Sequence, residues 1–331
     1  MDTFQAFMIR QEGEELKGNV ERLTLNDLPE GDVLVQVHFS GVNYKDGLAS
    51  LPQGKVVPQY PMIPGIDLSG EVVHSEHPDF KVGDLVLCTG YGLGTSHFGG
   101  FSRYARLSGD WLVHLPEGLT LREAMGIGTA GFTAAMSVDR LLHCGVTPDM
   151  GPILVTGATG GVGSFAVDML SRAGFQVTAS TGKIDKQKAW LESLGASSII
   201  GREEIADTAP GPISKQLWAG VIDPVGGPHL NSILKSIRYG GAVALSGLTG
   251  GTSFESTVHP FILRGVQLLG IDSVYCPKAW RNRIWSNLGG DWKPERALGV
   301  GIKECTLQEL PQVLQSILQG HAVGRTIVRL E

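Results

Sequence analysis

Residues 155–163 read VTGATGGVG and stand between two contrasting patterns. Before them, residues 153–155 form a short apolar run, which predicts a buried strand. After them, apolar residues recur at helical spacing and predict a helix over residues 161–173, ended by Gly174. A glycine-rich turn between a strand and a helix is typical of dinucleotide-binding proteins, because free amides at the helix N-terminus bind phosphate.

The turn itself is expected to bind the pyrophosphate of a dinucleotide. Gly160 lets the backbone approach the phosphates, and Gly163 lets the helix pack closely on the strand. Ala158 stands at the first glycine position of the usual G-x-G-x-x-G pattern, so the run departs from that pattern by one residue. The expected pyrophosphate-binding residues are Thr159, Gly160, Gly161 and Val162.

The segments that follow alternate between strand and helix patterns. Helices are predicted over residues 183–194 and 229–237. Further strands are predicted over residues 176–179, 198–200, 219–223, 242–246 and 266–271. This order predicts an α/β domain built on a doubly wound parallel sheet.

The earlier part of the chain has a different pattern. Residues 32–39 alternate apolar and polar side chains as a half-buried strand does, and residues 66–74 and 101–107 are similar. Short strands joined by glycine-rich loops predict a small, mostly antiparallel β-barrel. The end of the chain mixes helix and strand again, so we expect the parallel-sheet domain to be inserted between two pieces of the barrel domain.

The end of the second predicted strand of the parallel sheet indicates which dinucleotide binds. NAD sites place an acidic residue there to bind the ribose hydroxyls, but residues 178–183 contain no acid. Thr181, Gly182 and Lys183 offer a hydroxyl, open backbone and a cation instead, and Arg202 can add a second cation. A solvated strand end is the simpler alternative. NADPH is the expected cofactor.

Composition excludes several classes of protein. The chain has 331 residues, of which 42% are hydrophobic and 18% charged, so it can bury a large core. A net charge of -6 argues against nucleic acid as a partner. The sequence has neither an apolar run long enough for a membrane span nor a signal-peptide pattern at its start. We therefore expect a soluble, cytoplasmic protein without a membrane partner.

The cysteines give no sign of a metal site. Cys88, Cys144, Cys276 and Cys305 are far apart, with no C-x-x-C pair and no closely spaced histidine. Structural zinc sites bring paired ligands from short loops. We expect a zinc-independent protein that holds no metal.

A polar cluster occurs at residues 41–47, which read GVNYKDG directly after an apolar strand. Asn43, Tyr44 and Asp46 are therefore candidate catalytic residues, although a surface turn has the same composition. Asp67 is open to the same two interpretations, a residue in a cleft or the cap of a turn. His97, on a glycine-rich loop, is expected at the surface.

These motifs together resemble the medium-chain dehydrogenase/reductase superfamily over essentially the whole chain. Within that superfamily the chain resembles the YhdH/YhfP group of quinone oxidoreductase-like proteins, which includes NADPH-dependent acrylyl-CoA reductases. The resemblance rests on NYKDGL at 43–48, PMIPGID at 61–67, GDWLV at 109–113, GTAGFTAA at 128–135, VTGATGGVG at 155–163, DPVGG at 223–227, SGLTGG at 246–251, PFILRGV at 260–266 and GIDSV at 270–274.

The resemblance implies a fold and a set of site residues. It implies a GroES-like catalytic domain over residues 1–122 and 263–331 and a Rossmann NADPH-binding domain over residues 123–262. Zinc-dependent relatives carry G-H-E where this chain reads Gly65-Ile66-Asp67, which supports the zinc-free branch. By similarity, Thr181, Gly182, Lys183 and Arg202 hold the 2′-phosphate, and Tyr44, Leu248, Ile262 and Ser273 lie beside the nicotinamide.

The expected reaction is hydride transfer from NADPH to the activated double bond of an acrylyl-CoA-type thioester. Tyr44 is the expected proton donor, Asn43 or backbone amides stabilise the developing negative charge, and Asp46 orients the loop. The substrate is then a small, CoA-linked molecule. Two alternatives remain open, a quinone or enone reductase and a non-catalytic NADPH-binding sensor.

An apolar strand predicted at residues 266–271 bears on assembly. Relatives commonly pair through an edge of the Rossmann sheet, and this strand could extend the sheet across a two-fold axis. An ordinary last strand is the alternative. We expect a homodimer.

Overall fold

The computed structural model describes residues 3–206 and 211–330 and divides into two compact units. The first unit contains Met1–Thr129, Val274–Gly290 and Ile302–Glu331. The second unit contains Ala130–Ser273 and Asp291–Gly301. The chain therefore leaves the first unit and returns to it twice.

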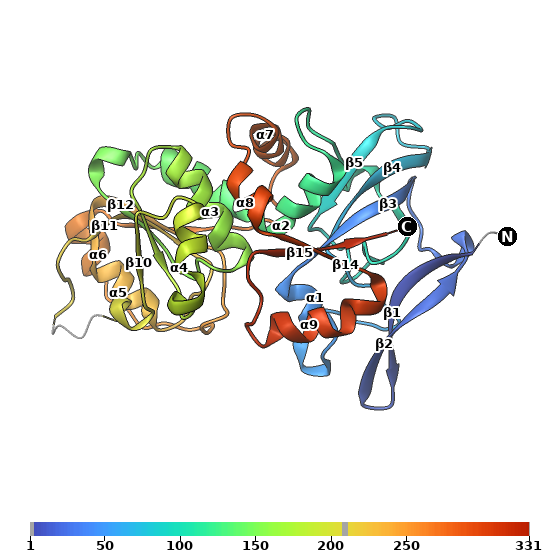
Figure 1. Ribbon diagram of the computed structural model, residues 1–331, viewed down its shortest axis with the longest axis horizontal. Helices are drawn as coiled ribbons and strands as arrows, with labels where there is room; N and C mark the ends of the chain where they lie inside the picture. Colours follow the sequence, from blue (N-terminus) through green and yellow to red (C-terminus); the bar gives the residue numbers. More distant parts are fainter. Residues whose placement is uncertain (1–2, 207–210, 331) are drawn as a thin grey trace. The chain divides into compact units, whose positions relative to one another are not determined.

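The second unit is built on a six-stranded parallel sheet (Figure 1). Its strand order is β10-β9-β8-β11-β12-β13, which is the 3-2-1-4-5-6 order of a Rossmann fold. The strands are β8 (Ile153–Val155), β9 (Val177–Ser180), β10 (Ser198–Ile200), β11 (Trp218–Asp223), β12 (Ile237–Leu245) and β13 (Gln267–Gly270). The predicted doubly wound sheet is confirmed.

Helices cover the sheet and complete a buried core. The helices of this unit are α3 (Gly161–Arg172), α4 (Ile184–Ser193), α5 (His229–Lys235), α6 (His259–Arg264) and α8 (Glu295–Val300). Helix α3 packs against β8, β9 and β11, and α5 and α6 pack against β12. Leu154, Val221 and Val243 on three neighbouring strands meet Leu230 and Leu234 of α5 in one apolar cluster. Burying such a side chain contributes about 1.5–3 kcal/mol, so the apolar strand pattern determines this core.

The limits of the units differ from the boundaries expected from sequence. Residues 263–273 were expected in the catalytic domain, but β13 pairs with β12 through residues 242–245 and 267–270 and so belongs to the parallel sheet. The expected boundary at 122/123 lies inside helix α2 (Leu121–His143), which runs from the first unit into the second. The apolar strand pattern at residues 266–271 agrees with this membership, so the expected boundary at 262/263 was placed too early in the chain.

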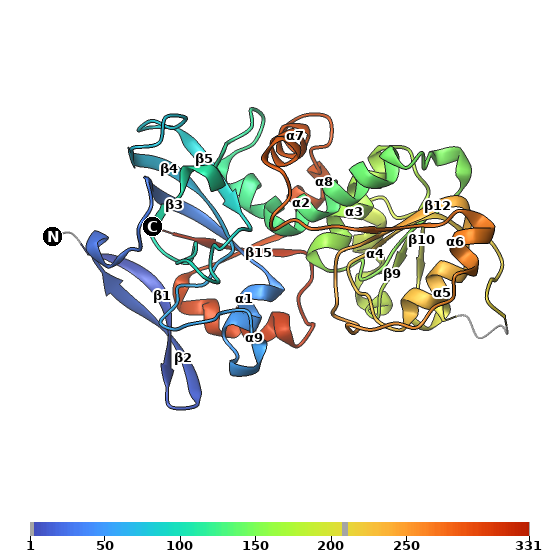
Figure 2. The same cartoon turned by 180° about the vertical axis from the view of Figure 1, so that it is seen from behind.

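The first unit holds a seven-stranded, mostly antiparallel sheet and a separate hairpin. The sheet order is β14-β15-β3-β4-β5-β7, with β6 also paired to β3. The hairpin of β1 and β2 is visible in both views (Figures 1 and 2). The strands are β1 (Phe4–Glu12), β2 (Glu15–Leu23), β3 (Val33–Val42), β4 (Asp67–Ser75), β5 (Leu85–Thr89), β6 (Tyr104–Leu107), β7 (Val113–His114), β14 (Ile302–Cys305) and β15 (Arg325–Arg329).

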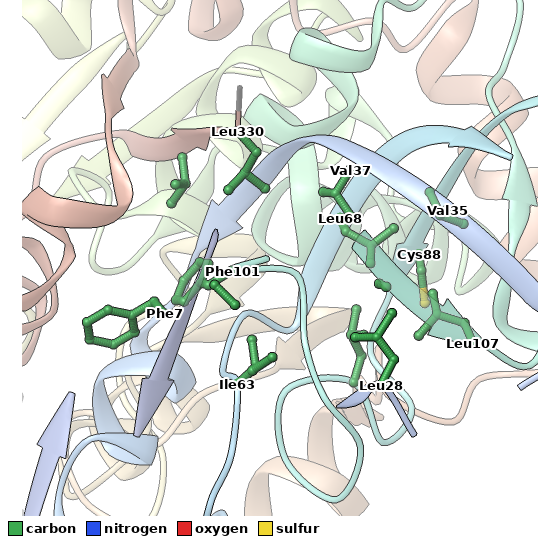
Figure 3. Close-up of a cluster of buried hydrophobic side chains, with 14 of the residues drawn as sticks. Phe7, Leu28, Val35, Val37, Ile63, Leu68, Cys88, Phe101, Leu107 and Leu330 are labelled. Carbon is green, nitrogen blue, oxygen red and sulfur yellow. The ribbon is translucent and has the colours of Figure 1, made fainter. Parts of the chain in front are cut away.

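Three further helices belong wholly to this unit, α1 (Tyr44–Ala49), α7 (Lys278–Gly289) and α9 (Leu310–Leu318). Helices α1 and α9 lie side by side (Figures 1 and 2), and a Cβ at Gly47 would lie 2.9 Å from the Leu318 side chain. Figure 3 shows part of the apolar core between the strands. Its labelled members are Phe7, Leu28, Val35, Val37, Ile63, Leu68, Cys88, Phe101, Leu107 and Leu330.

Most predicted elements are present with shifted ends. Strand β3 runs to Val42 rather than residue 39, and the helix expected over 229–237 ends at Lys235 because Ile237 begins β12. Helix α2 was not predicted as a helix. In the part of the chain that the structure describes, no helix has the length and apolarity needed to cross a membrane.

Candidate active site

The glycine-rich turn of the second unit follows β8 and leads into α3. Gly157 has a φ of 53°, a left-handed conformation that favours glycine. The Ala158 amide donates to the carbonyl of Ser180 at 3.0 Å, which ties the turn to the end of β9. A Cβ at Gly163 would lie 2.4 Å from the Gly157 carbonyl oxygen, so only glycine allows this close packing of helix on turn. Thr159, Gly160, Gly161 and Val162 therefore form a compact turn at the N-terminus of α3.

The expected 2′-phosphate residues come together at the carboxyl ends of β9 and β10. The hydroxyls of Thr159 and Thr181 are 3.1 Å apart, and the Lys183 amide donates to the Thr181 hydroxyl at 3.1 Å. A Cβ at Gly182 would lie 3.0 Å from Arg202 Nε, so the guanidinium rests on the open backbone of that glycine. Arg202 is exposed and Lys183 is half-buried, so both cations are accessible to an anion.

The three residues expected beside the nicotinamide all belong to the second unit. Leu248 follows β12, Ile262 lies on α6 and Ser273 follows β13. Leu248 is 57% exposed and Ile262 is 71% exposed. The hydroxyl of Ser246, at the end of β12, is buried without a hydrogen-bond partner among residues 3–206 and 211–330. A dinucleotide along this edge of the sheet fits these residues, because it supplies both apolar surface and polar groups.

In the first unit, the predicted catalytic residues lie where β3 passes into α1. Tyr44 is the first residue of α1, and its side chain is 37% exposed. Asn43 and Asp46 are buried beneath it. The structure thus separates the three predicted residues into one accessible side chain and two supporting ones.

Asn43 belongs to a buried charged cluster, the Asp67 cluster, which also contains Asp67, Thr129 and Arg325. Arg325 Nη2 lies 3.3 Å from Asp67 Oδ2, and both side chains are almost fully buried. Asp67 also accepts from Asn43 Nδ2 at 2.8 Å, from the Thr129 amide at 2.9 Å and from the Thr129 hydroxyl at 2.5 Å. Arg325 Nη1 donates to Asn43 Oδ1 at 2.9 Å and to the Val42 carbonyl at 2.7 Å. Both ends of the Asn43 amide are therefore engaged inside the protein.

The Asp46 carboxylate fixes the same loop from the other side. It accepts from the amides of Asn43 at 2.7 Å, Gly65 at 3.1 Å and Ile66 at 2.9 Å. Burial raises the pKa of this carboxyl to about 7, the charge of Asp67 adds to the rise, and the three amides oppose it. Burial also lowers the pKa of Arg325, against the attraction of Asp67 and Asp46. The Asp46 carboxylate is thus engaged by backbone amides rather than facing solvent.

Sequence reasoning missed Arg325 and Thr129 as members of this site. Arg325 looks like an ordinary residue of a late strand, and only the pairing of β15 with β3 brings it to Val42. Thr129 follows Gly128, whose φ of 49° breaks the regular geometry of α2. His97 is a structural residue, because its Nε2 lies 2.7 Å from the Arg106 carbonyl oxygen and its ring meets the Trp111 ring edge-on.

The donor groups near Asp67 do not fit zinc. The oxygens of Asp67 are engaged within the Asp67 cluster. Cys88 is opposite Leu68 in the sheet, and burial raises the pKa of its thiol to about 12. Zinc binds the thiolate, so this environment opposes ligation. The described residues contain no group of three or more histidine, cysteine and acidic side chains able to hold a metal.

Comparison with known proteins identifies the family. Residues 29–117 match the family alcohol dehydrogenase GroES-like domain, and residues 161–288 match the family zinc-binding dehydrogenase. The chain is 50% identical to "Putative quinone oxidoreductase YhfP" of Bacillus subtilis, over 99% of each chain. It is 46% identical to acrylyl-CoA reductase AcuI of Ruegeria pomeroyi, over 98% of each chain.

Solved structures agree with this assignment. The yhdH oxidoreductase of Salmonella enterica, crystallised with NADP, has a TM-score of 0.95 at 45% identity and covers 99% of this chain and 100% of its own. YhfP of Bacillus subtilis, crystallised with NAD, has a TM-score of 0.97 over 100% of each chain. The fold and the site define an oxidoreductase with a GroES-like and a Rossmann domain. The chain belongs to the medium-chain dehydrogenase/reductase superfamily, in the quinone oxidoreductase-like group.

Proposed function

We propose that the protein is an NADPH-dependent reductase of activated carbon–carbon double bonds, acting on an acrylyl-CoA-type thioester. The observation that carries the cofactor choice is the Arg202 guanidinium against the open backbone of Gly182, with Lys183 next in sequence and no carboxylate in residues 178–183. The relative AcuI, at 46% identity over nearly the whole chain, supports the thioester. The cofactor supplies a hydride when bound.

The residues of the second unit hold the cofactor in this proposal. Thr159, Gly160, Gly161 and Val162 meet the pyrophosphate at the start of α3, where backbone amides and the helix dipole favour negative charge. Thr181, Gly182, Lys183 and Arg202 hold the 2′-phosphate, because two cations and a hydroxyl suit a doubly charged anion. Leu248, Ile262 and Ser273 line the nicotinamide side.

Tyr44 is the proton donor in this proposal. A phenol hydroxyl can transfer its proton to the α-carbon of the reduced acyl group. Asn43 and Asp46 act on Tyr44 indirectly, because their side chains are engaged below the loop and set the start of α1. Negative charge on the thioester oxygen is then stabilised by backbone amides rather than by the Asn43 side chain.

The decisive experiment follows NADPH oxidation with acrylyl-CoA and with a benzoquinone, and repeats each assay with NADH. Efficient turnover of the thioester with NADPH, slow quinone reduction and weak use of NADH are the expected results. Fast quinone reduction without thioester turnover would favour a quinone reductase, which the relation to YhfP at 50% identity suggests. Tight NADPH binding without turnover of any acceptor would instead identify a binding protein.

Tyr44→Phe tests the proton donor. We expect a fall in kcat of about a hundredfold or more at saturating NADPH, the range in which a positioned acid contributes. The Kd for NADPH, measured by fluorescence titration, serves as the control and should stay close to that of the wild type. An unchanged kcat under conditions where chemistry limits the rate removes Tyr44 from the mechanism.

We further propose that two copies pair through the outer strand β13. This strand ends the sheet within the described residues, and Leu263 on the preceding helix α6 is 53% exposed. An outer strand offers unpaired backbone groups, and exposed apolar side chains favour association. Light scattering should give twice the 35.3 kDa mass of one chain. A mass of 35.3 kDa at working concentration would contradict this proposal.

A further inference from the structure

Asp223 is a buried carboxylate for which the proposed function gives no role. It is the last residue of β11 and is only 1% exposed. Its Oδ1 accepts from the Thr156 hydroxyl at 2.5 Å and from the Val225 amide at 3.0 Å, and both oxygens accept from the Gly226 amide at 3.2 Å. The described residues contain no cation paired with it. Four neutral donor contacts thus converge on one charge.

The loop that supplies the Val225 and Gly226 amides packs tightly against a second loop. The Ser246 amide donates to the Asp223 carbonyl at 3.0 Å, and the Gly250 amide donates to the Val225 carbonyl at 2.8 Å. A Cβ at Gly247 would lie 1.8 Å from the Pro224 carbonyl oxygen. The loop of residues 224–227 and the loop of residues 246–251 therefore behave as one body, which we call the paired loops.

The same carboxylate connects the paired loops to the phosphate-binding turn. Thr156 is the residue between β8 and Gly157, the first residue of that turn in the left-handed region. A Cβ at Gly157 would lie 2.9 Å from the Val225 side chain, so the turn and the paired loops are also in close contact. Movement of Asp223 would therefore change the spacing between the turn and the loops.

The strand order shows what this spacing controls. In a Rossmann sheet the first three strands bind the adenosine half of a dinucleotide and the last three bind the nicotinamide half, with the crevice between strands one and four. Here strands one and four are β8 and β11, and Thr156 and Asp223 extend from their adjacent carboxyl ends. The paired loops follow β11 and β12, on the nicotinamide side.

We propose that Asp223 is a positioning residue that holds the paired loops in register with the phosphate-binding turn, so that the nicotinamide half of the cofactor is bound. The proposal rests on the proposed function in requiring that the chain binds NADPH. Asp223 acts through the backbone of Val225 and Gly226 and through the Thr156 hydroxyl, without touching the cofactor itself.

The test compares two ligands by calorimetry, NADPH and 2′,5′-ADP, which has the phosphorylated adenosine but no nicotinamide. For Asp223→Asn we expect NADPH affinity to fall about tenfold, the factor that a lost hydrogen bond to a charged group can produce. Affinity for 2′,5′-ADP should stay within about twofold, because the β9 and β10 ends are unchanged. Equal weakening of both ligands, or no change in either, overturns the proposal.

Two further variants separate positioning from stability. Thr156→Val keeps the carboxylate and the shape of the site, and it should weaken NADPH selectively even where Asp223→Asn folds poorly. Asp168→Asn is the matched control, because Asp168 is also fully buried in this unit but holds the amide of Ala297 at 2.9 Å, at the start of α8. It should lower stability and leave both affinities within about twofold. If the wild-type chain does not bind NADPH, the proposed function is refuted. If the wild-type chain binds NADPH but Asp223→Asn does not weaken NADPH more than 2′,5′-ADP, only the role of Asp223 is refuted.

Discussion

Asp67 in the first unit and Asp223 in the second are two buried carboxylates that are stabilised by different kinds of groups. Each is at most 1% exposed, and each accepts a threonine hydroxyl at 2.5 Å. Asp67 also has a buried cation, Arg325, which comes from a strand 258 residues away. Asp223 is balanced by backbone amides only two and three residues ahead of it, together with Thr156.

The groups around each carboxylate determine which segments of that unit the carboxylate connects. The ion pair fastens β15 to the loop that presents Tyr44, so its loss should weaken the folding of the first unit. The amides of Val225 and Gly226 and the Thr156 hydroxyl fasten one loop to the glycine-rich turn, so their loss should weaken cofactor binding as well as the fold. Removing the cation from a buried ion pair leaves an uncompensated charge, which costs much free energy. A carboxylate with several neutral donors keeps the remaining hydrogen bonds when one donor is removed, so the cost is smaller.

The largest effect is expected for Arg325→Met. Removing the guanidinium leaves the Asp67 charge buried without its cation, and such a change costs about 3–5 kcal/mol. The free energy of unfolding from urea denaturation measures it. Asp67→Asn combined with Arg325→Met should be less destabilising than the sum of the two single changes, because neither charge is then left alone. A cost below about 1 kcal/mol for Arg325→Met would mean that the pair is not the main support of β15.

A smaller effect is expected for the two threonines. Thr156→Val removes a hydroxyl from a carboxylate that has no cation among the described residues, and it should cost about 1.5–3 kcal/mol. Thr129→Val removes the equivalent hydroxyl from Asp67, which keeps Arg325 and Asn43, so it should cost about half as much or less. Urea unfolding of both variants gives the comparison directly. Equal costs would show that Arg325 does not compensate for the lost donor.

The last effect concerns Asp46 and depends on pH. Its pKa in the folded protein is about 7, above the ordinary 3.8, so at pH values between these two the folded protein keeps a proton that the unfolded chain releases. The stability that this proton contributes is full below about pH 4 and is lost as the pH rises toward 7. Stability relative to Asp46→Asn should therefore fall by at most about 1.4 kcal/mol per pH unit in that window and level off above it.

The measurement for Asp46 is a series of urea unfolding curves at pH 5, 6, 7 and 8 for both proteins. Asp46→Asn is neutral at every pH, so it removes this titration and keeps one acceptor oxygen for the amides of Gly65 and Ile66. Curves that run parallel for the two proteins would mean that Asp46 is ionised throughout the range.

The parallel sheet could be predicted almost completely from sequence, because its information is local. The run at 155–163 and the alternating apolar strands identify β8, α3 and the sheet class without knowledge of distant contacts. The residues proposed to hold the 2′-phosphate could also be singled out, since the absence of an acid and the presence of Lys183 are visible at one strand end. The kinked helix α2 was missed because Gly126, Gly128 and Gly131 obscure its periodicity.

The first unit was less predictable because its site is assembled from distant segments. Asn43, Tyr44 and Asp46 stand together in sequence, and their polarity alone marked them. Their separation into one exposed and two buried side chains follows from hydrogen bonds to residues 65, 66 and 67 and to Arg325. No local pattern identifies Arg325 as the partner of Asp67, since an arginine in a strand is ordinarily exposed.

The sequence by itself determined the class of fold, the dinucleotide-binding turn and the absence of paired zinc ligands, because each depends on residues close together along the chain. Only the tertiary structure decided which polar residues are buried, which carboxylate has a cation and which depends on neutral donors. The physical reason is that the free energy of a buried charge depends on the groups that surround it in space. The Arg325 guanidinium at Asp67 and the Thr156 hydroxyl at Asp223 both come from segments far away in sequence.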